Sequence, residues 1–154
     1  MRHLFVGSEG TLGLITEVDI RLTTQPEPQI VMVVGVPRVK DLLHVLNTFS
    51  AQLTLSAFEF FSDLALDKVR AHRSLPEPLE NREAYYALLE FDYSALDQAS
   101  AAFEQAMAQG WVTDGVISQS EAQAQSLWQL REGISESIAP YTPYKNDLSV
   151  CVHP

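Results

Sequence analysis

The sequence predicts an α+β domain built on one mixed sheet, with its helices packed on one face. Two stretches carry this prediction, residues 30–61 and 84–118. In each, an apolar run typical of a strand, an amphipathic helix and a second apolar run follow one another. Two such strand–helix–strand units are typical of a ferredoxin-like sheet. With 154 residues, of which 46% are hydrophobic, the chain is long enough for one well-packed core.

Near the N-terminus, the chain reads Gly7-Ser8-Glu9-Gly10-Thr11-Leu12-Gly13. Glycines at every third position, with hydroxyl residues between them, favour a sharply bent backbone whose N–H groups can approach a phosphate. A plain turn is the alternative interpretation. Residues 14–22 are predicted to form a strand, and residues 23–28, with two prolines, a stiff connector at a domain boundary.

The first strand–helix–strand unit begins with the apolar run 30–36, which is typical of a strand that is covered on both faces or central in a sheet. Pro37 is expected in the first turn of the following helix. A second strand is predicted at 55–61, and Ser62 is expected to cap a short helix. The first helix should bury one apolar stripe, made of Val39, Leu42, Leu43, Leu46 and Phe49.

The second unit follows an expected surface loop at 71–83. A strand is predicted at 84–91, then a helix capped by Ser94 with Asp97 and stopped at Gly110, then a strand at 112–118. Ser120 and Gln123 form the capping box of a long helix that is expected to reach about residue 139. Residues 144–152 are predicted to form a final strand.

Charge and composition exclude several classes of protein. The chain has 20 acidic and 10 basic residues and a formal net charge of -10, so it should repel nucleic acid and anionic membranes. No apolar run approaches the ~20 residues of a membrane span. The single cysteine, Cys151, cannot form an internal disulfide, and we expect a soluble cytoplasmic protein.

Catalytic and metal-binding constellations are not predicted. The carboxylates show no paired arrangement of a general acid and a general base. The four histidines lack the clustering of metal ligands; they are His3, His44, His72 and His153.

A candidate anion site lies near the C-terminus. Arg131 and Ser135 are four residues apart, hence on the same face of a helix, and Lys145 follows. A guanidinium fork, a neutral hydroxyl donor and an ammonium group together suit the carboxylate of a 2-hydroxy acid. The alternative is structural: Arg131 pairs with Glu132 or another surface acid, and Lys145 is simply exposed.

Three strings resemble one family. VGSEGTLGLITEVDIRL resembles the segment that closes the FAD-binding domain of flavoproteins of the vanillyl-alcohol-oxidase type, in the branch that oxidises D-2-hydroxy acids. LWQLREGISESI followed by YKNDLS, and SAFEFF, resemble segments of the substrate (cap) domain of the same branch. The resemblance implies that Arg131, Ser135 and Lys145 hold the substrate carboxylate. It also implies that six residues near the N-terminus contact the FAD: Gly7, Ser8, Gly10, Thr11, Gly13 and Ile15.

The resemblance also implies an organisation. Residues 1–25 would be a remnant of the end of the FAD-binding domain, its loop and strand, and residues 26–154 a substrate domain truncated at its C-terminal end. The complete enzyme would transfer a hydride from C2 of D-lactate, glycolate or D-2-hydroxyglutarate to flavin N5. The metal site and catalytic histidine of that branch lie downstream of YKNDLS. We therefore expect this chain alone to be inactive, to bind no FAD and to bind a 2-hydroxy acid anion weakly.

Two other interpretations stay open. The chain is alternatively a stand-alone ferredoxin-like module that binds a ligand or forms a homo-oligomer. It is alternatively one subunit of a split flavoenzyme, completed by a separate FAD-domain subunit.

Overall fold

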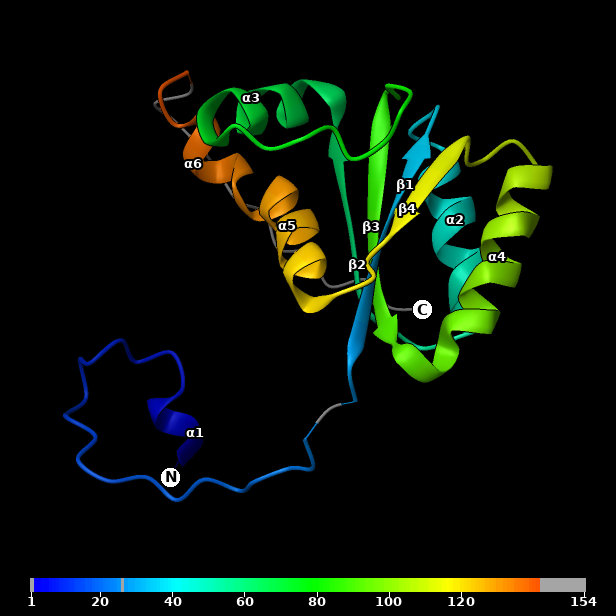
Figure 1. Cartoon of the computed structure of the whole chain (residues 1–154). Helices are drawn as coiled ribbons and strands as arrows, with labels where there is room; N and C mark the ends of the chain where they lie inside the picture. The colour runs from blue at the N-terminus through cyan, green and yellow to red at the C-terminus, as the bar shows by residue number, and fades with distance from the viewer. Residues whose placement is uncertain (1, 26, 142–154) are drawn as a thin grey trace.

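The computed structural model describes residues 2–25 and 27–141. Residues 29–141 form a sheet with helices packed against it, and residues 2–25 form an extended segment that lies apart from the sheet (Figure 1). In this segment a short helix, α1 (Arg2–Phe5), is followed by turns and by backbone without regular structure. The sheet and its helices therefore contain nearly all of the packed core.

The sheet has four strands: β1 (Gln29–Val36), β2 (Leu55–Ser62), β3 (Tyr85–Asp92) and β4 (Asp114–Ile117). Their order is β2-β3-β1-β4, which is the ferredoxin-like order predicted from the two strand–helix–strand units. The α+β class is thus confirmed. The predicted mixed sheet is wrong, because β3 enters antiparallel between β1 and β2, and β4 pairs antiparallel with β1.

Both faces of the sheet are covered by helices. α2 (Asp41–Ser50) and α4 (Leu96–Ala108) pack on one face, as expected for the two crossover helices. α3 (Asp63–Arg73), α5 (Glu121–Glu132) and α6 (Ile134–Ile138) lie on the other side (Figure 1). The prediction of helices on one face is therefore wrong as a whole.

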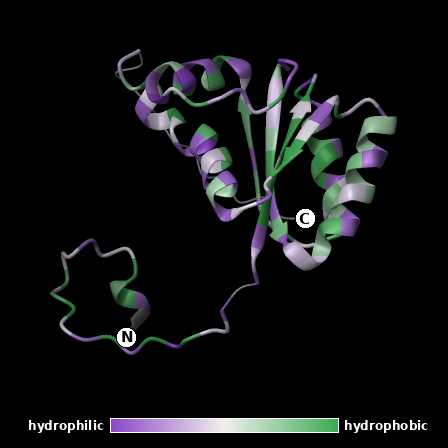
Figure 2. Ribbon diagram, in the orientation of Figure 1, coloured by the Kyte–Doolittle hydropathy of each residue, from purple (hydrophilic) through white to green (hydrophobic). Residues whose placement is uncertain are grey.

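The sequence of β1 gives the physical reason for the second helical layer. Val31 and Val33 are fully buried on the face that α5 covers, and Val34 is fully buried on the opposite face beside Met32. A continuous apolar run cannot leave either face in water without losing hydrophobic stabilisation. Figure 2 shows green (hydrophobic) stretches of the strands between the two helical layers, next to paler and purple ones.

The first crossover helix begins later than expected. α2 starts at Asp41, and Pro37 lies in the bend that precedes it rather than in its first turn. Its buried apolar side chains are Leu42, Val45 and Phe49. Leu43, placed in the predicted stripe, is 65% exposed, because it lies about 100° around the helix from Leu42.

Two of the three predicted N-caps are present. Ser62 Oγ accepts a hydrogen bond from Ala65 N at 3.3 Å, and Ser120 Oγ accepts one from Gln123 N at 3.2 Å. Ser94 is not a cap, because it lies within the 3-10 turn Tyr93–Ala95, and Ala95 holds the N-cap position of α4. Its hydroxyl instead donates to a carboxylate oxygen of Glu27.

The predicted long helix from Ser120 is divided at Gly133 into α5 and α6. A Cβ at this position would lie 2.9 Å from the Gln129 carbonyl oxygen and 3.0 Å from Cγ1 of Val69 in α3. The absence of a side chain therefore lets the α5–α6 junction approach α3 closely.

The predicted strand at residues 14–22 is not formed. Leu14 is 92% exposed and Leu22 is 87% exposed, and no strand within residues 2–25 and 27–141 pairs with this segment. An extended chain becomes a strand only when a neighbour accepts and donates its backbone hydrogen bonds. The final predicted strand, 144–152, lies outside the described residues. Within the described part, no helix is long and apolar enough to cross a bilayer.

Candidate functional site

Arg131 lies in the last turn of α5 and contacts the sheet. Its Nε donates to Oε2 of Glu59 on β2 at 3.0 Å, and the two side chains are 38% and 40% exposed. The sequence left open whether Arg131 forms an ion pair with an acid. The structure shows such a pair and identifies the acid as Glu59 rather than the adjacent Glu132.

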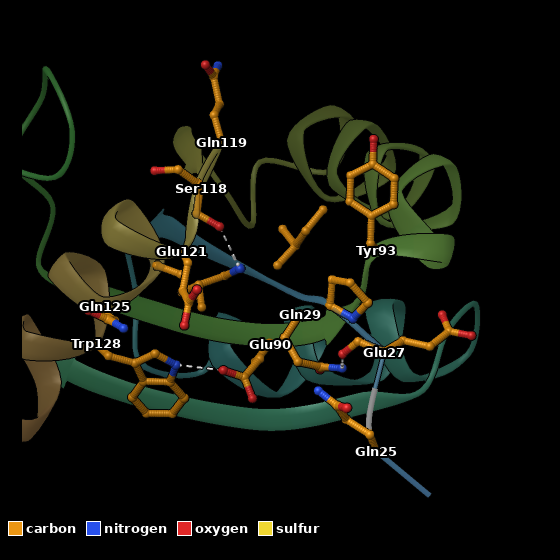
Figure 3. A pocket seen from close by; sticks show the side chains of 15 residues that line it. Gln25, Glu27, Gln29, Glu90, Tyr93, Ser118, Gln119, Glu121, Gln125 and Trp128 are labelled. Carbon is orange, nitrogen blue, oxygen red and sulfur yellow. Dashed lines mark hydrogen bonds between the residues drawn. The ribbon is translucent and has the colours of Figure 1, made fainter.

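A second contact joins α5 to the same face of the sheet. The indole Nε1 of Trp128 donates to Oε2 of Glu90 on β3 at 2.7 Å (Figure 3). Glu90 pairs with Ala57 in the strand register and Glu59 pairs with Leu88, so the two glutamates are diagonal neighbours on one face. Two residues one helical turn apart, Trp128 and Arg131, thus bind two neighbouring carboxylates.

A hollow of about 680 Å³ lies between the start of β1 and the first turns of α5 (Figure 3). A second hollow, of about 520 Å³, shares Trp128 and Glu90 with it and extends toward Glu132. The sequence did not predict these hollows, because residues from three distant stretches line them. The first is lined by polar and acidic side chains, among them Gln29, Glu27, Glu90, Ser118, Glu121 and Trp128.

The charge of this hollow bears on its ligand. Glu27, Glu90 and Glu121 line it, and among the described residues that line it there is no Arg or Lys. Carboxylates repel an anion at short range. The described lining of the hollow is therefore acidic, and Arg131 is a cation on the same face of the sheet that can attract a carboxylate.

The other two predicted substrate residues are placed differently. Ser135 lies in α6, beyond the break at Gly133, and is exposed. Beside it, Glu136 accepts a hydrogen bond from Arg73 Nη2 at 2.5 Å, which holds the pKa of Glu136 below its ordinary value. Lys145 lies outside the described residues. The structure thus places Arg131 in a contact on the sheet and Ser135 beyond the break in the helix.

The glycine loop has the backbone that its composition predicts. Gly7 and Gly10 have φ angles of +81° and +80°, which favour glycine. The backbone N and Oγ1 of Thr11 both donate to the Ser8 carbonyl, at 2.9 and 2.7 Å, and so close a local turn. Around Gly7 and Gly10 the space is open, and Ile15 is 69% exposed.

This geometry bears on the predicted FAD contact. The residues predicted on the FAD side lie on an exposed loop, whereas a cofactor site buries most of its ligand. The loop therefore fits a contact with one phosphate group and does not fit the enclosure of a whole dinucleotide. As to metals, no group of three or more His, Cys, Asp or Glu side chains that could hold an ion occurs among the described residues.

A ferredoxin-like α+β domain with a partly exposed arginine over one sheet face defines a fold class, but not a function. Comparison with known proteins is more specific. Residues 25–153 match the family described as FAD linked oxidases, C-terminal domain. The chain belongs to this family, and the resemblance noted in the sequence is confirmed.

Individual relatives agree. The chain is 53% identical over 152 residues to a D-2-hydroxyglutarate dehydrogenase of Xanthomonas citri pv. viticola. The matched region covers 97% of this chain and 32% of the relative. It is 50% identical over 155 residues to a D-2-hydroxyglutarate dehydrogenase of Stutzerimonas stutzeri, covering 99% of this chain and 33% of the relative. A putative mitochondrial D-lactate dehydrogenase of Schizosaccharomyces pombe is 32% identical over 158 residues, covering 97% and 30%. The chain spans about a third of the length of the curated relatives it matches.

Proposed function

We propose that this chain is the substrate-side part of an FAD-dependent D-2-hydroxy acid dehydrogenase whose substrate is D-2-hydroxyglutarate. The observation that carries the proposal is the identity of 50% or more, over almost the whole chain, to two proteins named D-2-hydroxyglutarate dehydrogenase. In the complete enzyme, FAD supplies the acceptor for a hydride from substrate C2. Residues 26–154 would then form the substrate domain, and residues 1–25 the end of the FAD-binding domain.

Arg131 is the proposed contact for a substrate carboxylate. Its guanidinium carries five N–H donors in a planar fork, and Glu59 uses the one on Nε. The terminal nitrogens can therefore still bind a carboxylate with two parallel hydrogen bonds. Ser135 would add a neutral donor and Lys145 a positive charge, as the family resemblance implies.

The glycine loop is proposed to contact one phosphate of FAD. Its positive-φ glycines present the backbone closely to a ligand, and the hydroxyls of Ser8 and Thr11 add donors. Because the loop is open on most sides, the rest of the cofactor would be enclosed by other parts of the complete enzyme. We propose that the isolated chain holds no FAD.

A domain exchange tests the proposed function. The matching third of the Stutzerimonas stutzeri enzyme would be replaced by this chain, and reduction of the flavin would be followed after adding D-2-hydroxyglutarate, D-lactate or glycolate. We expect a yellow chimera that is reduced fastest by D-2-hydroxyglutarate. Arg131→Ala in the chimera should raise KM by about 10- to 100-fold, the range for a lost hydrogen bond to a charged group.

The flavin spectrum separates misfolding from lack of activity. A chimera that retains flavin and is reduced by none of the three acids would contradict the proposal. The isolated chain should show no visible flavin absorbance after gel filtration, and retained stoichiometric flavin would contradict its proposed dependence on other parts of the enzyme. A stable homodimer, together with an inactive yellow chimera, would favour the stand-alone module.

A further inference from the structure

The contact between Arg131 and Glu59 is one-sided. The acid binds the guanidinium at Nε, the edge nearest the helix, at 3.0 Å. Glu132 is the next residue in the chain, yet it forms no ion pair within the described part of the protein. Among the described residues, the guanidinium contacts an acid at Nε, and the edge formed by its two terminal nitrogens faces no acid.

Glu59 lies on a rigid support. It pairs in register with Leu88, which is fully buried, and Phe61 two residues further along β2 is 3% exposed. The backbone of a paired strand moves little, so the position of the Glu59 Cα is well defined. The Glu59 carboxylate can therefore restrict the flexible side chain of Arg131.

The helix that carries Arg131 is held in the same way. One turn earlier, Trp128 donates to Glu90, and Leu130, between the two, is 2% exposed against the core. The rotation of α5 about its axis is therefore fixed by a buried leucine and an indole hydrogen bond. Only the outer part of the Arg131 side chain remains to be oriented, and that part is the one Glu59 binds.

We propose that Glu59 is a positioning residue for substrate binding. By accepting the hydrogen bond from Nε, it directs the terminal nitrogens of Arg131 toward the place where the substrate carboxylate binds. Part of the rotamer freedom of the arginine is then lost before the substrate arrives, so binding loses less of it. This inference rests on the proposed function, because it needs Arg131 to bind the carboxylate.

Glu59 has a second effect with the opposite sign. Its negative charge offsets that of Arg131 and so weakens the attraction for an anion. Glu59→Gln removes the charge and keeps an oxygen that can accept from Nε, whereas Glu59→Ala removes both. The difference in KM between these two variants therefore reports orientation alone. Glu132→Gln is the matched control for a nearby charge that does not hold the guanidinium.

The first readout needs no substrate. In the 154-residue chain, NMR relaxation of the Arg131 Nε–H reports whether the guanidinium is ordered. We expect the same order in the unchanged chain, in Glu59→Gln and in Glu132→Gln, and motional averaging in Glu59→Ala. Equal order in Glu59→Ala would overturn the inference, because Glu59 would not be holding the side chain.

The second readout is KM for D-2-hydroxyglutarate in the chimera described above. Glu59→Ala should have a KM about 2- to 5-fold above that of Glu59→Gln, as expected for the loss of one partly exposed hydrogen bond, with a smaller change in kcat. Glu132→Gln should stay close to the unchanged chimera. If Arg131→Ala leaves KM unchanged, the proposed function fails. If Arg131→Ala raises KM while the two Glu59 variants are equal, the proposed function stands and the inference fails.

Discussion

Residues 14–22 and 29–36 are both sequences with the character of strands, yet only the second forms one. In β1, Val31 and Val33 are fully buried, and both edges of the strand are paired, with β3 and with β4. In the N-terminal segment, Leu14 and Leu22 are exposed at 92% and 87%. The difference shows that an apolar pattern makes a segment suitable for a sheet, but that the segment forms a strand only when a neighbouring strand pairs with it.

The same contrast separates the two proposed half-sites. The glycine loop is stabilised by local turns, with hydrogen bonds that span three residues. Arg131 is held by a partner 72 residues away in the chain, on a strand with a buried neighbour. A site supported by long-range contacts should keep its geometry in this chain, while the loop has no comparable support among the described residues.

The largest expected difference between the two regions is in the unfolding free energy lost when a leucine is replaced by alanine. Leu88→Ala removes a fully buried side chain from the central strand β3 and should cost about 2–5 kcal/mol of unfolding free energy. Leu14→Ala should change it by less than about 0.5 kcal/mol, because that side chain is exposed. Urea unfolding of both variants measures the difference. A loss of more than about 1.5 kcal/mol in Leu14→Ala, on the order of a buried contact, would mean that the segment packs on the domain.

Glycines provide the next comparison. Gly133→Ala places a Cβ against Gln129 and Val69 and should cost about 1–3 kcal/mol through overpacking. Gly10→Ala strains its own loop, where φ is +80°, but the domain should unfold at the same urea concentration because the loop does not pack on it. Equal midpoints for the two variants would contradict this division.

Helix caps give the smallest expected effect. Ser62→Ala and Ser120→Ala should each cost about 1 kcal/mol, because each hydroxyl accepts a hydrogen bond from a backbone N–H of the first helical turn. Ser94→Ala is the matched control: its hydroxyl donates to the exposed Glu27 side chain and caps no helix, so its loss should cost a few tenths of a kcal/mol. Thermal unfolding of the three variants provides the measurement. A Ser94→Ala cost equal to the others would show that the hydroxyl has a capping role.

The sequence predicted the elements of the domain well because their signals are local. The continuous apolar run of β1 indicated a strand covered on both faces or central in a sheet, and Ser62 and Ser120 preceded their helices at the expected positions. The expectation of helices on one face ignored that indication, since α3, α5 and α6 must cover the face that carries Val31 and Val33. The prediction for Ser94 failed because this residue lies within a 3-10 turn, which single-residue preferences do not reveal.

The candidate site was predictable only in part. Arg131 was identified, together with the possibility that it pairs with an acid, but the contacts that hold it were not. Glu59 is 72 residues from Arg131 and Glu90 is 38 residues from Trp128, so neither contact leaves a periodic signal along the chain. Their placement depends on strand register, which side-chain type alone does not fix. Each of β2 and β3 has one glutamate within an apolar run. These two glutamates were the signal that could have suggested a polar patch on the α5 face.

The strand order has a consequence for synthesis on the ribosome. Of the four strands of this sheet, β1 is made first, but its neighbour β3 begins roughly 50 residues later, and β4 later still. At ~5–20 residues per second, the strand waits roughly 3 to 10 seconds with both edges unpaired. Its run Ile30–Val34 combines β-branched residues with no charge, the kind of segment that associates with other unfolded chains. The ferredoxin-like order thus makes the earliest strand the one most dependent on protection during translation.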